Sequence, residues 1–230
     1  MKKSENDFTG IVPPSIGALF SLKYLFLTRN QLNGSLPTQG MYLIKFYVII
    51  FFFFTKLKKI INTFFFFFFA GLCGLKKLEG LDLSKNYFEG TLPSCLYNFT
   101  SLQLLDIHEN QFRVNISSLI ARLTSLKLID LRFNLFEGFS FGLLANHSRL
   151  EFVRCICNDK DAKIETESSD WVPLFQLDFL VISNCNLNKL SNKVPTFLLH
   201  QHNFRVLDLS NNMLKGRLPR WLFENNMRLE

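Results

Sequence analysis

The sequence predicts an α/β solenoid, in which short repeated coils stack side by side with a parallel β-sheet along one face. Leucine recurs in the spacing Leu-x-x-Leu-x-x-Leu-x-Leu, and an asparagine follows three positions after the last leucine. A glycine and often Leu-Pro come next. Copies of this pattern begin at or near Leu19, Leu75, Phe99, Leu123 and Phe204. This regular recurrence indicates that each copy is one structural unit of a repeat protein.

The asparagine of each copy sets the length of the unit. Successive asparagines lie 24 residues apart from Asn86 through Asn158, and the slot is then taken at intervals of 27 residues by Cys185 and Asn212. An amide can both donate to and accept from backbone groups, and a buried group without a partner costs about 1–3 kcal/mol. We therefore expect the asparagines to join neighbouring coils, and the coil at Cys185 to be held more loosely.

Each segment of the unit has its own predicted conformation. Leu-x-Leu is a short strand whose two leucines point to the same side, because side chains alternate along a strand. One strand cannot bury that side alone, so neighbouring units must stack around a shared core. The glycine permits a positive φ, and Leu-Pro ends the segment. We expect a concave parallel sheet on one side of the coils and an irregular or 3₁₀-helical convex side.

An insert divides the chain into repeats at 1–40, the insert at 41–71 and repeats at 72–230, with lengthened repeats near 159–200. The insert holds 11 of the 27 phenylalanines of the chain. Its first apolar stretch, 41–54, is shorter than the roughly 20 residues that cross a bilayer. As a loop, the insert would expose a large apolar patch and an aggregation-prone run.

A third interpretation of the insert is that it is a translated intron. Its residues are those that A/T-rich codons encode, and a phenylalanine run followed by Ala70-Gly71 is what a pyrimidine tract and its acceptor site would give. Joining Gly40 to Leu72 restores a repeat of 25 residues. We favour the hypothesis of a retained intron over that of a membrane-associated segment.

Composition and charge exclude several classes of function. The chain is 48% hydrophobic and 20% charged, which is typical of a folded protein. Its net charge is +7, but the insert supplies four lysines and no acid, and no basic run is interleaved with aromatic residues. We therefore predict no nucleic-acid binding. Because there is no glycine-rich phosphate loop and the histidines lack a recognisable nucleophile, we also predict no enzyme activity and no cofactor.

The five cysteines do not form a metal motif. Cys155 and Cys157 lack the second pair or the histidines that a zinc site needs, so we predict no metal and interpret Cys157 as a half-buried thiol. Cys73 and Cys95 occupy nearly equivalent places in successive units once the insert is discounted. They form either a disulfide or two buried thiols.

The repeated pattern resembles plant-type leucine-rich repeats with their Leu-x-Gly-x-Ile-Pro signature, and three runs in the sequence resemble runs found in plant receptor-like proteins. They are Asn-Gly-Ser-Leu-Pro-Thr-Gln-Gly at 33–40, Leu-Phe-Gln-Leu at 174–177 and Ser-Asn-Cys-Asn-Leu-Asn-Lys-Leu at 183–190. The resemblance is to receptor-like proteins, which are cell-surface receptors with a repeat ectodomain and one membrane helix. It covers all of the chain except the insert, and receptor kinases share the same repeats.

The resemblance implies a ligand-recognition ectodomain on the extracellular face of the cell membrane, acting in signalling, defence or development. Its partners would be a peptide or protein ligand and a co-receptor. Membrane association would use a segment outside this sequence or, as the alternative, residues 41–71. The first residues contain no apolar stretch typical of a signal peptide. A second hypothesis is a soluble repeat protein, such as an inhibitor of secreted cell-wall enzymes.

The outward positions of the predicted strands are candidates for ligand contact, because solenoids usually bind partners along that face. The candidates are Tyr24, Phe26, Asp82, Tyr87, Asp106, His108, Asp130, Arg132, Arg154 and Asp208. The repeated aspartate would form either an acidic stripe or, as the simpler interpretation, a local contact with the backbone. The aromatic residues are candidate anchors.

Other marked residues belong to the surface of the predicted solenoid. Asn-x-Ser/Thr sequons at Asn33, Asn98, Asn115 and Asn146 are candidates for N-glycosylation. The charged stretch 159–173 would be a binding loop or, in the interpretation that we favour, a solvated excursion with Trp171 packed on the coil.

Overall fold

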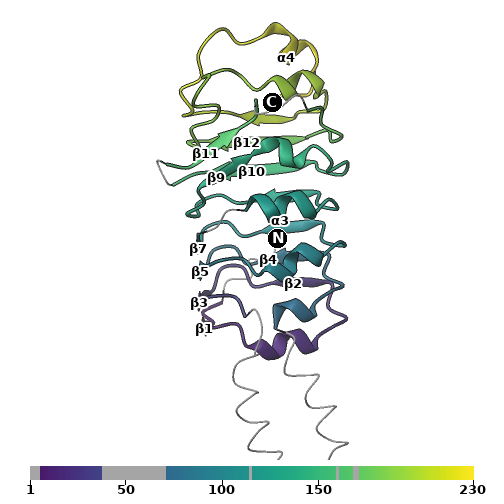
Figure 1. The fold of residues 1–230 in the computed structure, drawn as a ribbon, viewed down its shortest axis with the longest axis vertical. Coiled ribbons are helices and arrows are strands. Elements are labelled where there is room, and N and C mark those ends of the chain that lie inside the picture. Colours follow the sequence, from purple (N-terminus) through teal and green to yellow (C-terminus); the bar gives the residue numbers. More distant parts are fainter. Residues whose placement is uncertain (1–5, 38–70, 114–115, 159–160, 168–170) are drawn as a thin grey trace, which may run out of the picture.

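The computed structural model describes residues 6–37, 71–113, 116–158, 161–167 and 171–230. Its coils stack along one axis, from the N-terminal coils in purple to the C-terminal coils in yellow (Figure 1). The predicted parallel-sheet repeat architecture is confirmed. Residues 41–70 of the insert lie outside the described residues, and Gly71 immediately precedes the first 3₁₀ helix after it.

One seven-stranded parallel sheet runs the length of the stack, with the order β13-β12-β10-β8-β6-β4-β2. Its strands are β2 (Tyr24–Phe26), β4 (Gly80–Asp82), β6 (Leu104–Asp106), β8 (Leu128–Asp130), β10 (Phe152–Ile156), β12 (Phe179–Ser183) and β13 (Val206–Asp208). The middle positions align in one column that includes Leu81, Leu105 and Ile129. These side chains are buried, and each contributes about 1.5–3 kcal/mol by leaving water.

A second parallel sheet, which the repeat pattern did not predict, lies beyond the turn that follows each strand. It has the order β1-β3-β5-β7, with β1 (Thr9–Gly10), β3 (Gln31–Gly34), β5 (Tyr87–Gly90) and β7 (Gln111–Phe112). Further along the stack, β9 (Gly138–Ser140) pairs with β11 (Lys163–Glu165). Tyr87 therefore lies in β5 and not on the seven-stranded sheet, so its predicted place on the ligand face is wrong. The chain turns between the two sheets at Lys85, whose φ is 54°.

Short helices form the remaining side of the coils, as predicted. They are the 3₁₀ helices η1 (Pro14–Ala18), η2 (Leu72–Gly74), η3 (Ser94–Asn98), η4 (Phe141–Leu144) and η5 (Thr196–His200), with α3 (Ser117–Arg122) and α4 (Arg220–Glu224). Several follow a proline, whose fixed φ suits a helix start. Within the described ranges, each helix is too short and too polar to cross a membrane.

The asparagines join neighbouring coils, as the sequence predicted. The Nδ2 atom of Asn110 donates to the carbonyl oxygen of Leu83 in the preceding coil at 2.9 Å, and its Oδ1 atom accepts from the backbone N–H of Phe88 at 3.0 Å. Asn86, Asn134 and Asn212 are buried and bond in the same way, and the buried Asn30 accepts from the backbone N–H of Phe8 in the preceding coil. Asn158 is exposed, so the prediction for that position is wrong. The chain leaves the regular coil there and later forms β11.

The excursion that follows Asn158 is held down by Trp171. The Trp171 ring stacks on Phe197 with a centroid distance of 5.3 Å, and its Nε1 atom donates to the carbonyl oxygen of Thr166 at 2.9 Å. The favoured interpretation, in which Trp171 packs on the coil, is confirmed.

Candidate ligand-binding face

The outward side of the seven-stranded sheet, here called the strand face, carries nine of the ten predicted ligand candidates. Each coil presents two outward strand positions and a third just after the strand. The candidates on the strand face are Tyr24, Phe26, Asp82, Asp106, His108, Asp130, Arg132, Arg154 and Asp208. The tenth, Tyr87, lies on the second sheet. The strand face therefore has aromatic residues near its N-terminal end and charged residues in its middle.

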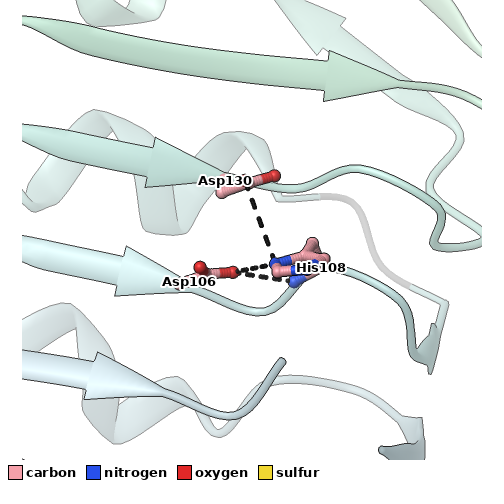
Figure 2. Close-up of side chains that lie close together, drawn as sticks. All are labelled: Asp106, His108 and Asp130. Carbon is pink, nitrogen blue, oxygen red and sulfur yellow. Dashed lines mark hydrogen bonds and ion pairs between the residues drawn. The ribbon is translucent and has the colours of Figure 1, made fainter. Parts of the chain in front are cut away.

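A charged cluster occupies the centre of the strand face. The Nδ1 atom of His108 lies 2.6 Å from the Oδ1 atom of Asp106 and 3.9 Å from the Oδ2 atom of Asp130 (Figure 2). Arg132 holds Asp130 through two atoms, with Nε 2.8 Å from Oδ1 and a terminal nitrogen 2.8 Å from Oδ2. Arg154 reaches the same oxygen at 3.7 Å. Two cations therefore share one carboxylate.

Burial and charge pairing explain the pKa shifts in this region. Asp130 is only 2% exposed, and its hydrogen bonds to Arg132 raise the pKa of that guanidinium group. Burial lowers the pKa of Arg154, although both remain charged at neutral pH because arginine titrates far above it. Burial also raises the pKa of Asp82, opposed by its hydrogen bonds to Ser84. The paired charges favour a fixed arrangement of these side chains.

The cluster also contains a set of possible metal ligands. One group of histidine and aspartate residues in the described part of the chain has ligand atoms that all lie within 4.8 Å of one another. It consists of Asp106, His108 and Asp130. A divalent ion bound there would have to displace Arg132 from Asp130 and the His108 ring from Asp106. The existing contacts therefore satisfy these groups without an ion.

The repeated aspartates contact their own backbone, which confirms the simpler interpretation of their position. The Oδ1 atoms of Asp82 and Asp208 accept from the backbone N–H two residues later, at 2.9 and 2.8 Å respectively. Asp106 and Asp130 do the same. This contact stabilises the turn that leads out of each strand.

An aromatic platform lies next to the charged cluster. Phe152 in β10 and Phe179 in β12 are stacked with a centroid distance of 4.3 Å, and the Arg154 guanidinium lies 4.5 and 4.4 Å from the two ring centres. Phe179 was not among the predicted candidates. The spacing Leu177-x-x-Leu180 could have identified it, because it places Phe179 at an outward strand position.

A second aromatic pair lies at the N-terminal end of the strand face. The Tyr24 and Phe26 rings are 6.0 Å apart and exposed, and the Tyr24 hydroxyl donates to Glu79 at 2.9 Å. Gly80 leaves room for them, since a Cβ atom there would lie 2.8 Å from the Tyr24 ring.

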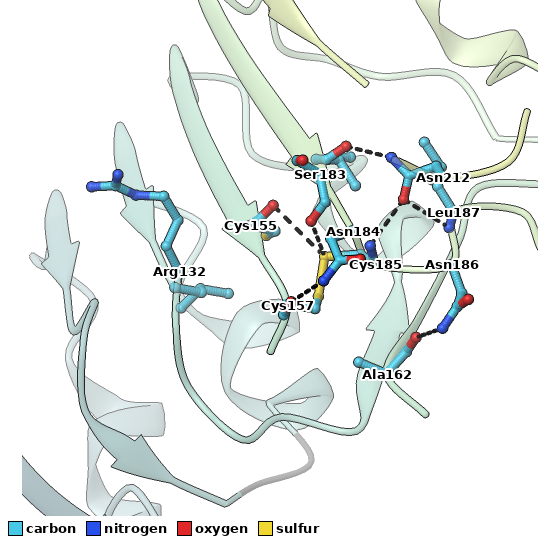
Figure 3. The surroundings of a disulfide bond; sticks show 12 residues. Arg132, Cys155, Cys157, Ala162, Ser183, Asn184, Cys185, Asn186, Leu187 and Asn212 are labelled. Atoms are coloured by element: carbon cyan, nitrogen blue, oxygen red, sulfur yellow. Dashed lines mark hydrogen bonds between the residues drawn. A yellow bond between two sulfur atoms is a disulfide. The ribbon is translucent and has the colours of Figure 1, made fainter. Parts of the chain in front are cut away.

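A disulfide fixes the strands that carry the Phe152–Phe179 platform. Cys157, just after β10, is bonded to Cys185, just after β12 (Figure 3). The predictions of a half-buried thiol at Cys157 and of a looser coil at Cys185 are therefore wrong. The covalent bond takes the place of the missing amide, and Asn184 and Asn186 add bonds to carbonyl oxygens of Cys157 and Ala162.

The other cysteines take two different states. Cys73 and Cys95 form a disulfide between successive coils, which decides between the two alternatives left by the sequence. Cys155 is buried as a free thiol, and burial raises its pKa. The thiolate is the reactive form of cysteine, so Cys155 is protected from reaction.

The repeat geometry agrees with comparisons to known proteins. The model of the Leucine Rich Repeat family matches residues 77–99 and 203–225. These two segments are leucine-rich repeats. Its curated relatives are receptor-like proteins: it is 53% identical to receptor-like protein 13 of Arabidopsis thaliana over 70% of its length. It is 35% identical to Cuscuta receptor 1 of Solanum lycopersicum over 94% of its length.

The chain spans 15% of the first of these relatives and 16% of the second. Solved structures with the same fold include a TDR receptor, with a TM-score of 0.63 and 22% identity over 97% of this chain and 36% of that one. Another is the Arabidopsis receptor kinase HAESA in complex with the peptide hormone IDA and the co-receptor SERK1. Its TM-score is 0.59, with 24% identity over 95% of this leucine-rich-repeat chain and 34% of HAESA.

Proposed function

We propose that this chain is part of the ligand-recognition ectodomain of a cell-surface receptor-like protein, and that its strand face binds a peptide or protein ligand. The ectodomain would lie outside the cell and act with a co-receptor in signalling, in defence or development. Membrane association would use a segment outside this sequence. The proposal assigns the chain a binding role without catalysis.

The observation that carries the proposal is the arrangement of Phe152, Phe179 and Arg154. These groups form a rigid, partly exposed platform beside the Asp130–Arg132 pair. Aromatic and arginine side chains carry much of the binding energy of protein interfaces, and rigid groups lose little entropy on binding. HAESA, which has a similar fold, was crystallised with a peptide hormone and a co-receptor.

Selection from a displayed library of random peptides tests this proposal. Peptides that bind the chain should lose about tenfold or more in affinity with Arg154→Ala or Phe179→Ala, since interface hot spots cost more than 1 kcal/mol. The matched control is Glu89→Ala, an exposed position on the second sheet, which should leave affinity unchanged. Peptides that are insensitive to both strand-face substitutions would contradict the proposal.

A further inference from the structure

Asn33 and Tyr87 are neighbours on the outer side of the second sheet. They are directly paired in the parallel register of β3 and β5, although the insert and a whole coil separate them in sequence. Leu32 precedes Asn33 in β3, and Phe88 follows Tyr87 in β5. Both of these side chains point inward and are buried. Because side chains alternate along a strand, Asn33 and Tyr87 both face solvent, with Tyr87 56% exposed.

Asn33 is the acceptor position of the sequon Asn33-Gly34-Ser35. Its side chain is exposed, and its amide makes no hydrogen bond to another residue in the described ranges. The strand ends at Gly34, whose φ of 72° turns the chain, and Ser35 is also exposed. The amide and the hydroxyl of this sequon are therefore both on the surface.

We propose that Asn33 carries an N-linked glycan whose first sugar rings pack on the Tyr87 ring. Neighbouring strands of a sheet lie about 5 Å apart, which brings a sugar on Asn33 close to the Tyr87 side chain. The apolar C–H side of N-acetylglucosamine suits the face of an aromatic ring, and the ring hydroxyl suits the polar sugar edge. Within the described residues the Tyr87 hydroxyl has no hydrogen-bond partner.

The covalent step is transfer of an oligosaccharide from a lipid-linked pyrophosphate donor. The Nδ2 atom of Asn33 forms a bond to the anomeric carbon of the first N-acetylglucosamine. The bond from that carbon to the pyrophosphate oxygen breaks, and the leaving pyrophosphate keeps the electron pair while the amide loses one proton. The transfer takes place in the secretory pathway. The inference therefore rests on one part of the proposed function, which is the extracellular location.

The other described sequons lack such a platform. Asn98 is the last residue of η3 and Asn146 follows η4, so neither is paired with an aromatic residue in a sheet. The ring of Tyr97, beside Asn98, is already covered by Arg122 at 5.6 Å. Asn115 lies outside the described residues. Glycans at the three described sequons would leave the strand face open.

To test this inference, the full chain is expressed in plant cells with an added secretion signal. Intact glycopeptides are analysed by mass spectrometry, and thermal unfolding is compared between the chain and Ser35→Ala, which abolishes the sequon but keeps Asn33. We expect a glycan at Asn33, and a fall in Tm of about 2–4 °C in Ser35→Ala, the shift that about 1 kcal/mol gives in a domain of this size.

Tyr87 variants separate the glycan contact from the sequon itself. In a Tyr87→Ala background, Ser35→Ala should no longer lower Tm, whereas Tyr87→Phe keeps the ring and should restore the fall. An equal fall in the Tyr87→Ala background, or an unmodified Asn33 beside modified Asn98 and Asn146, would overturn the inference alone. Absence of glycans from all these sites in the secreted chain would also overturn the inference, whereas the proposed ligand binding is tested separately by the peptide selection.

Discussion

The backbone N–H of Leu72 donates a 3.2 Å hydrogen bond to the carbonyl oxygen of Pro37, across the whole of residues 38–70. The strands on either side of that segment also pair directly, with Tyr24 beside Gly80 and Phe26 beside Asp82. The coil before the insert and the coil after it are therefore ordinary neighbours in the stack.

Deletion of residues 41–71 should preserve the fold. Joining Gly40 to Leu72 would leave three residues between Pro37 and Leu72, and their hydrogen bond would then close a single helical turn. We expect the deletion variant to keep the circular dichroism spectrum of the full chain and to have a Tm that is no lower. Aggregation should decrease because the phenylalanine run is removed. An unfolded deletion variant would contradict this expectation. Transcript reads that join the codons for Gly40 and Leu72 would support a retained intron.

Substitution of Asn134 should destabilise the chain far more than substitution of Asn158. The Asn134 amide donates to the Ile107 carbonyl at 2.9 Å and accepts from the Phe112 N–H at 3.2 Å. Asn134→Ala leaves the buried Phe112 N–H unpaired and leaves the Ile107 carbonyl oxygen with only the Asn110 amide as donor, which costs about 1–3 kcal/mol. Asn158→Ala, the control, should change the free energy of unfolding by less than about 0.5 kcal/mol because Asn158 is exposed. Denaturant unfolding measures both, and similar losses would argue against the ladder.

Loss of the Cys157–Cys185 disulfide should weaken the coil that carries the Phe152–Phe179 platform. We expect the double substitution of both cysteines by serine to cost about 2–4 kcal/mol in the free energy of unfolding, as removal of a native disulfide usually does.

Mass spectrometry of the native chain after iodoacetamide treatment should find Cys155 unmodified, because its thiol is buried and its pKa is raised. Alkylation of Cys155 in the folded chain would refute its burial.

Stability should fall in mild acid because of His147. This side chain is fully buried, its Nδ1 atom lies 3.1 Å from the Leu144 carbonyl oxygen, and burial lowers its pKa below the ordinary value of 6.5. The unfolded chain therefore binds the proton more readily than the folded chain. The contribution of neutral His147 to stability is therefore complete above pH 6.5, and it is lost as the pH falls through the lowered pKa.

A single substitution isolates the effect of His147. His147→Leu places at this position the residue that other repeats have, as at Leu123, and removes the titrating group. The fall in Tm between pH 7.5 and pH 5 should be smaller in this variant than in the parent chain. If the two chains lose stability equally, another group is responsible for the acid sensitivity.

The sequence predicted the regular coils well because periodic leucines and asparagines encode contacts that repeat at every step. It failed at Asn158, which has the correct spacing but lies where the chain leaves the regular coil, and at Cys185, whose partner lies in another coil. Phe179 was missed because the lengthened repeat disturbs the numbering of positions. These three errors fall where the period changes, whereas Tyr87 was misplaced in a regular coil because the repeat pattern did not predict the second sheet.

The repeated positions alone determined that this chain is a stack of coils with a leucine core, an amide ladder and one outward strand face. Only the tertiary structure decided which surface residues are neighbours: Arg154 beside two stacked phenylalanine rings, Cys157 bonded to Cys185, and Tyr87 beside Asn33 on a second sheet. The physical reason is that burial of apolar side chains follows the local period, whereas contacts between coils depend on the register in which distant segments pack.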